Sequence, residues 1–166
     1  VDLVCTNGIE EDYELGDKVR KAGKLFWQYG GGQSRRYGYG FYFGAWDSRG
    51  SLCWAYNWGK RFDITEGSNW EYAWYSPFET IATPTYEEIR EAWDDRRYLE
   101  TAKAAAKAAG KDIAPLIEQI RKETLDNRGS GGRDLVNDFW EEGRDASKMD
   151  YWRKLLADKI IELTAK

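Results

Sequence analysis

The segment KLFWQYGGG at residues 24–32, an apolar run that ends in three consecutive glycines, decides the expected fold. Two further runs, at residues 1–6 and 51–58, are also rich in β-branched or aromatic residues and adjoin glycine, as strands do. All three runs are continuously apolar, which is typical of strands that are buried on both faces of a parallel sheet. Their spacing leaves room for a crossover after each of the first two runs. The sequence therefore predicts repeated strand–helix units.

The segments between these runs supply the expected crossovers. A short helix is predicted over residues 13–22, with Gly23 as its stop. A second helix is predicted over residues 35–49, where three glycines make the helix propensity poor and only tertiary packing would hold the segment helical. Residues 59–82 are predicted to form one long polar and aromatic loop. Such long loops are uncommon in compact domains unless they form a lid or a binding loop.

The clearest helix signal lies in TPTYEEIREAWDDRRYL at residues 83–99 and continues to Gly110. Pro84 suits the first helical turn, and glycine is a common helix stop. The expected apolar stripe of this helix consists of Ile89, Ala92, Trp93, Leu99, Ala102 and Ala106. Further packing helices are predicted around residues 113–120 and 152–163, and the start of another at 135–140 after a glycine-rich connection at 127–133.

The composition limits the classes of function. A chain of 166 residues with 42% hydrophobic and 33% charged residues has the size and balance of one globular domain. A net charge of −4 argues against a nucleic-acid-binding protein, because nucleic acid is held by many lysine and arginine contacts to phosphate. No run approaches the roughly 18 apolar residues of a membrane span, so no membrane partner is expected. Seven of the nine tryptophans lie within residues 27–93, where a binding function is therefore expected.

The chemistry available to the chain is restricted. It contains no histidine, which removes the commonest general base, the usual zinc ligand and every Ser-His or Cys-His nucleophile. Cys5 and Cys53 each lie within an apolar run, which indicates buried thiols in preference to a disulfide or a metal site. We therefore expect no metal and no cofactor, and we assign no catalytic residue.

The adjacent carboxylates Asp94 and Asp95 resemble a glycosidase pair at first sight. Neighbouring helical residues point about 100° apart, so these two side chains cannot face one reaction centre from the same helix. Ion pairs with Arg90, Arg97 or a neighbouring segment explain them better. Glu10 and Glu11, just after the first run, are better placed for chemistry but give only a weak signal.

In a barrel of parallel strands, ligand-binding groups lie at the C-terminal ends of the strands and in the loops that follow. This rule selects a set of aromatic and polar residues, whose stacking surfaces and hydrogen-bond donors suit sugars. The predicted substrate-binding residues are Gln28, Tyr29, Arg35, Asn57, Trp58 and Trp70. For Trp58 and Trp70 a place in the core is an equal alternative, and the three glycines after Tyr29 suit a tight turn somewhat better than a close approach of the backbone to a ligand. By contrast, Trp27, Trp54 and Trp93 are expected in the core.

The quoted segments, together with GSLCWAYNW at residues 50–58, resemble the C-terminal portion of glycoside hydrolase-like TIM barrels. The comparison is with an uncharacterised carbohydrate-associated domain related to the β-N-acetylgalactosaminidase family. The resemblance implies an α/β fold in which residues 1–110 form a partial barrel, the last three βα units of a (β/α)8 barrel, with strands six to eight and their helices. Residues 111–166 would be a helical C-terminal extension that packs on it.

Such hydrolases use an Asp-Glu pair on an earlier strand, and no such pair can be matched in this sequence. We therefore expect the C-terminal portion of a carbohydrate-active protein, which supplies the walls of a sugar-binding cleft and is inactive alone. The alternatives are a non-catalytic module that binds glycans or a protein, and a purely structural fragment. Because three parallel strands leave two unpaired edges, we also expect self-association or pairing with a missing N-terminal barrel portion.

Overall fold

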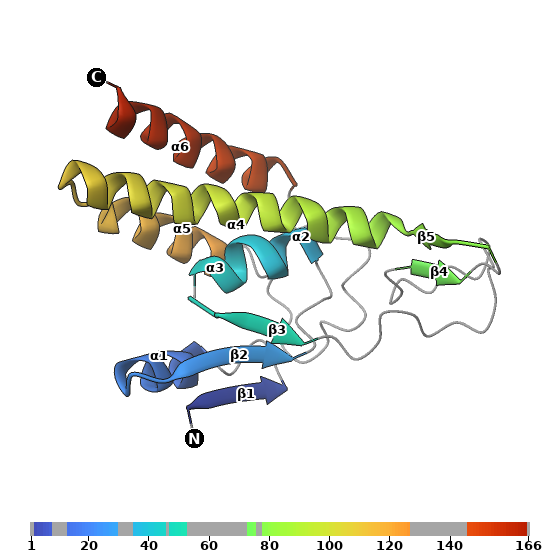
Figure 1. Ribbon diagram of the computed structural model, residues 1–166. Coiled ribbons are helices and arrows are strands. Elements are labelled where there is room, and N and C mark those ends of the chain that lie inside the picture. The colour runs from blue at the N-terminus through green and yellow to red at the C-terminus, as the bar shows by residue number, and fades with distance from the viewer. Residues whose placement is uncertain are drawn as a thin grey trace.

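The computed structural model describes residues 2–7, 13–29, 35–45, 47–52, 73–75, 78–126 and 146–165, in some of them the main chain only. Helices account for most of the described residues (Figure 1). The elements in chain order are β1 (Leu3–Asn7), α1 (Tyr13–Lys21), β2 (Leu25–Tyr29), α2 (Arg35–Tyr37), the π-helix η1 (Gly38–Tyr42), α3 (Phe43–Ala45), β3 (Gly50–Leu52), β4 (Ala73–Tyr75), β5 (Thr80–Ala82), α4 (Pro84–Ala109), α5 (Ala114–Asp126) and α6 (Ala146–Thr164).

The first three strands form a small sheet in the order β1-β2-β3, and both pairs are parallel, as expected. α1 connects β1 to β2, and Gly23 between them has a φ of 69°, a left-handed conformation that favours glycine. Phe26 in β2 is fully buried, and a Cβ atom on Gly16 of α1 would lie 3.1 Å from its ring. α1 therefore covers the face of the sheet to which Phe26 points.

The long helix α4 has the expected limits, and its caps explain them. The Thr83 hydroxyl accepts a hydrogen bond from the Tyr86 N–H at the first turn, and Pro84 occupies the first helical position. At the other end, Gly110 has a φ of 62° and donates its N–H to the last turn. Local sequence is sufficient to begin and end this helix.

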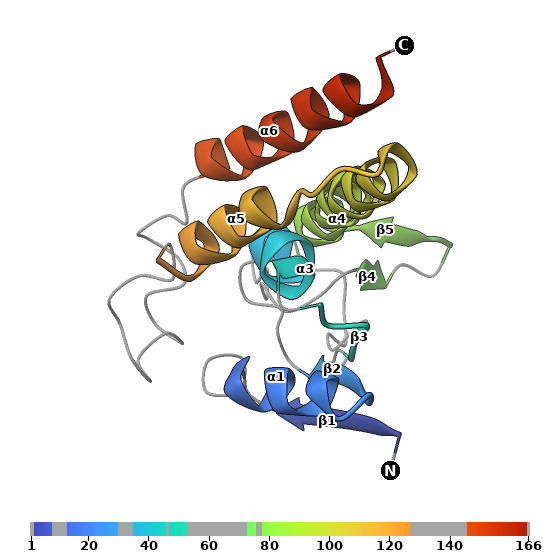
Figure 2. The same cartoon turned by 90° about the vertical axis from the view of Figure 1, so that its left-hand side faces the viewer.

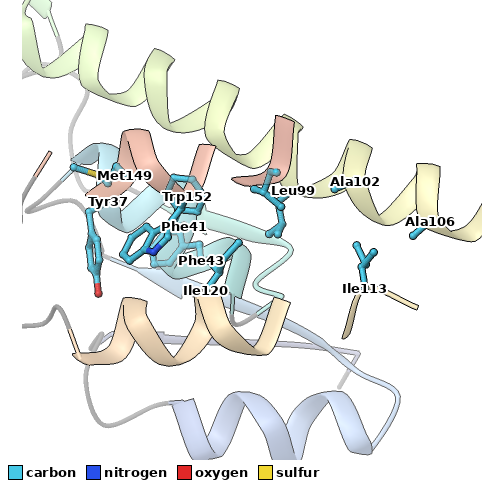
Figure 3. Packing of buried hydrophobic residues seen from close by; sticks show 11 residues of the cluster. Tyr37, Phe41, Phe43, Leu99, Ala102, Ala106, Ile113, Ile120, Met149 and Trp152 are labelled. Carbon is cyan, nitrogen blue, oxygen red and sulfur yellow. The ribbon is translucent and has the colours of Figure 1, made fainter. Parts of the chain in front are cut away.

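The main hydrophobic core lies among the helices (Figure 3). Trp152 of α6 is fully buried, and its ring meets Phe41 of η1 edge to face with centroids 5.2 Å apart. Its indole N–H donates to Glu123 of α5 at 2.7 Å, so one aromatic side chain joins three elements. The cluster draws on residues from both sides of position 110: Tyr37, Phe41, Phe43, Leu99, Ala102, Ala106, Ile113, Ile120, Met149, Trp152 and Leu156.

The glycine-rich segment α2–η1–α3 is helical throughout residues 35–45, as predicted, but the expected continuation to residue 49 is wrong because residues 47–49 are not helical. A Cβ atom on Gly40 would lie 3.2 Å from the Ala92 carbonyl oxygen of α4, and one on Gly44 would lie 2.8 Å from the Leu99 side chain. Both glycines therefore permit α4 to approach closely. Tertiary contact with α4 holds this segment helical in spite of its poor propensity.

The expected partial (β/α)8 barrel, with its last three βα units and helical C-terminal extension, is wrong. The described residues are mainly helical, and the parallel sheet has only three short strands. α4, which the resemblance implied to be the helix of the last βα unit, packs most extensively against α6 and η1 (Figures 1 and 2). The physical reason is its buried face, because Ala92, Ala102 and Ala106 are small enough to admit neighbouring helices closely. The apolar side chains of α4 are thus buried in contacts with other helices.

Three smaller expectations also fail. Residues 59–82 are not one irregular loop, because β4 and β5 within them pair antiparallel as a second sheet. Trp93 is not in the core but 53% exposed, since it lies about 100° around α4 from the buried Ala92. Cys5 is not a buried thiol but is exposed, at the middle of the edge strand β1. Cys53, Trp54 and the helix expected at 135–140 lie outside the described residues.

Candidate functional site

The solvent side of α4 carries a continuous row of large side chains, which we call the aromatic–arginine face. It consists of Tyr86, Arg90, Trp93 and Arg97. These positions are spaced by four, three and four residues, so they lie above one another along one side of the helix. Tyr86 is 41% exposed and Trp93 is 53% exposed, and both arginines are exposed. The row lies opposite the buried stripe of the same helix.

Ion pairs fix the arginines of this face. Arg90 donates to Glu87 at 2.7 Å and to Asp94 at 3.2 Å, and it also pairs with Glu91. Arg97 donates to the other oxygen of Asp94 at 3.1 Å. The Asp94 carboxylate therefore bridges the two arginines, and the ion-pair interpretation of Asp94 is confirmed. Each exposed pair contributes little to stability, but together they restrict the side-chain conformations of the face.

The side chain of Trp93 contacts Arg96. The Arg96 guanidinium carbon lies 5.9 Å from the centre of the Trp93 ring, within the range of a cation–π contact. Arg96 also donates a hydrogen bond to the carbonyl oxygen of Ser48, just before β3. Because burial removes it from water, the pKa of Arg96 lies below its ordinary value. The contact ties the position of Trp93 to the sheet.

Where α4 packs against α2 and α6 lies a set of charged side chains from three helices, which we call the charge network: Arg36, Glu91, Asp95, Asp150 and Arg153. Asp95 of α4 is fully buried and accepts hydrogen bonds from Arg36 of α2 at 2.9 Å and from Arg153 of α6 at 2.5 Å. Arg36 also donates to Asp150, and Arg153 to Glu91. The ion-pair interpretation of Asp95 is confirmed as well.

The protonation of the network follows from burial and hydrogen bonding. Burial raises the pKa of Asp95 above its ordinary value, while the hydrogen bonds from Arg36 and Arg153 act in the opposite direction. For Arg36 and Arg153, burial would lower the pKa, but hydrogen bonds to Asp95 and to their second carboxylates raise it on balance. The hydrogen bond from Arg153 lowers the pKa of Glu91. Two cations thus hold one buried carboxylate in place.

This arrangement positions helices and side chains, but it offers no evident reaction. Both oxygens of Asp95 are occupied by guanidinium donors, so the carboxylate is not poised to take a proton from a ligand. Within the described part of the chain, no group of three or more Cys, Asp or Glu side chains could hold a metal ion. None of the helices described there is both long and apolar enough to cross a lipid bilayer.

The structure tests the predicted substrate-binding residues only in part. Gln28 and Tyr29 end β2, where Tyr29 lies between Asn7 of β1 and Leu52 of β3, and Arg35 begins α2. The main chains of these three residues are described, but their side chains are not. Asn57, Trp58 and Trp70 lie outside the described residues. The sugar-binding cleft therefore stays a prediction.

The aromatic–arginine face was not predicted, although the sequence contains its signal. Tyr86, Arg90, Trp93 and Arg97 follow the periodicity of one helical face. Trp93 was instead placed with Ala92 on the apolar stripe of the helix. A count of angular positions around the helix separates the two residues and would have placed Trp93 on the polar side.

Comparison of the chain with protein-family models, with curated proteins and with solved structures gives no match in any of the three.

Proposed function

We propose that the chain is a non-catalytic protein-interaction module, and that a partner protein binds the aromatic–arginine face of α4. The observation that carries the proposal is Trp93, a large apolar side chain that is half exposed at the centre of the row. Tryptophan, tyrosine and arginine are the residues that most often dominate the binding energy of protein interfaces. The face presents all three types, with carboxylates at its border.

The shape of the face favours a protein partner over a sugar. Sites for small ligands are concave and surround most of the ligand. The aromatic–arginine face instead lies along one side of a single helix, which is convex. A convex row with anchors at helical spacing fits into a groove of a partner, as in helix-in-groove recognition. We therefore expect the partner to supply an apolar groove for Trp93 and Tyr86, with polar groups at its border.

The ion pairs around the face also favour recognition. Arg153 is fixed by the buried Asp95 and in turn holds Glu91, which pairs with Arg90 on the face. Side chains that are already restricted lose less conformational entropy when a partner binds. The charge network thus restrains Arg90 of the face through Glu91, in the way that supporting hydrogen bonds preorganise a binding site.

The test compares Trp93→Ala with Tyr151→Ala, a matched control on the outward side of α6, where Tyr151 is similarly exposed at 48%. Both variants should retain the circular dichroism spectrum of the wild type. Proteins retained from source-cell extract by the immobilised wild type are identified, and the affinity of each is measured with purified components. We expect one partner that binds the wild type and Tyr151→Ala equally. Trp93→Ala should weaken that complex by about 2 kcal/mol or more, roughly thirtyfold in Kd.

A glycan array with the same three proteins separates the alternatives. Binding to a sugar that depends on Trp93 would overturn the protein assignment in favour of glycan recognition. A partner whose affinity is the same for Trp93→Ala and the wild type would show that the aromatic–arginine face is not the binding surface.

A further inference from the structure

β1 is one of the two edge strands of the parallel sheet. Among the described elements it pairs only with β2, and no other described element lies beyond it in either view (Figures 1 and 2). An outer strand presents a row of main-chain donors and acceptors that can pair with another strand. Proteins usually protect such an edge with a charge, a proline or a bulge. The five residues of β1, Leu3–Asn7, contain no charge and no proline.

An apolar surface continues from this edge onto one face of the sheet. The parallel register pairs Leu3 with Leu25 and Cys5 with Trp27, so these four side chains lie on the same face. Leu3 is 37% exposed, Leu25 is 50% exposed and Cys5 is exposed. Phe26, which points to the opposite face, is the residue that α1 buries. The edge of β1 that no other described strand pairs therefore adjoins an exposed apolar face.

We propose that β1 pairs with β1 of a second copy of the chain, antiparallel about a two-fold axis at Cys5. A two-fold axis relates a strand to itself in the antiparallel direction, which makes the interface self-complementary. Centring on Cys5 is the register that pairs all five residues of the strand. It places Leu3 opposite Asn7, Val4 opposite Thr6, and Cys5 opposite Cys5 of the second copy.

The charges around the edge agree with this register. Like charges directly opposite each other destabilise a strand pair, and the register centred on Cys5 places no charged residue within the five pairs. The nearest charge is Asp2, whose carboxylate accepts a hydrogen bond from Lys24 of the same chain at 2.8 Å. A shift of the centre to Val4 would bring Asp2 into the ladder and reduce the paired residues. The inference does not depend on the proposed function of α4.

Cysteine cross-linking tests the register directly. Opposite residues of an antiparallel pair have Cα atoms about 4.5–5.5 Å apart, a separation that a disulfide can bridge. Mild oxidation of a Cys53→Ser variant, which retains Cys5 alone, should give a covalent dimer in high yield. The matched Cys5→Ser variant, which retains Cys53 alone, should not. Failure of the first variant to cross-link would overturn the proposed register.

Sedimentation equilibrium tests the association without cross-linking. The wild type and Cys5→Ser should both be dimers, because serine is small and uncharged. Cys5→Lys should weaken the dimer at least about tenfold, because it places two like charges directly opposite each other. A wild type that stays monomeric at high concentration, or a Cys5→Lys variant that still dimerises fully, would contradict the proposal. If Cys5→Lys loses its fold by circular dichroism, the cross-linking result decides.

Discussion

Replacement of Arg153 by methionine should test the energetic role of the charge network. The variant removes one of the two cations that hold the fully buried carboxylate of Asp95, and also the partner of Glu91. Breaking a buried ion pair by removal of one partner typically costs 3–5 kcal/mol. Arg36 still donates to both oxygens of Asp95, so we expect the lower end, about 3 kcal/mol. For a chain of this length the loss corresponds to a decrease in Tm of about 6–12 °C.

The loss of stability should depend on pH. Burial raises the pKa of Asp95 in the folded state, so the protonated form favours folding, and this contribution is lost as the pH rises through the folded pKa. Without Arg153 that pKa rises further, so the ionised carboxylate costs more at neutral pH. The pKa of Glu91 is lowered by Arg153, so its contribution is present above its unfolded pKa and lost as the pH falls. Both effects make the variant's deficit largest at neutral pH and smaller in acid.

Urea denaturation followed by circular dichroism measures the free energy of unfolding at neutral pH and at about pH 4.5, near the carboxyl pKa values. Arg97→Met is the control, because Arg97 is exposed and pairs only with Asp94 among the described residues. It should cost less than about 1 kcal/mol at both pH values. A deficit for Arg153→Met below about 1 kcal/mol, or one that does not shrink in acid, would refute the reasoning.

Two glycine substitutions test the packing and the end of α4. Gly40→Val should destabilise the fold by about 2 kcal/mol in urea denaturation, because its Cβ would lie 3.2 Å from the main-chain oxygen of Ala92, which cannot move aside. No loss would mean that the helices are less closely packed than described. Gly110→Ala should lower the free energy of unfolding by about 1 kcal/mol, because a left-handed φ of 62° is strained for alanine. An unchanged midpoint would show that the cap contributes little.

Several local features of the fold were predictable because short-range chemistry determines them. Thr83, Pro84 and Gly110 set the limits of α4 through capping and backbone preference. The three apolar runs gave the positions of β1, β2 and β3 and their parallel direction, since continuous apolar strands at that spacing require crossovers. The ion pairs of Asp94 followed from the positions of neighbouring arginines on one helix.

The error in the architecture came from long-range choices. Both a barrel and a helix cluster can bury the stripe of α4, so the periodicity of residues 84–109 does not name the partner of that face. The buried position of Asp95 could not be predicted either, because its partners Arg36 and Arg153 are separated from it by 59 and 58 residues in the sequence. The outward position of Trp93 could be predicted from helical geometry, but Trp93 was placed on the apolar stripe with Ala92.

The sequence by itself determined the limits of α4 and the positions and direction of β1, β2 and β3, because backbone preference and periodicity act over a few residues. Only the tertiary structure decided that α4 packs on α6 and η1, that Asp95 is enclosed by two arginines, and that β1 is left at the edge of the sheet. The physical reason is that hydrophobic burial is non-directional. Any close packing of apolar faces is therefore stabilising, and the shapes of the helix and sheet surfaces determine which faces pack together.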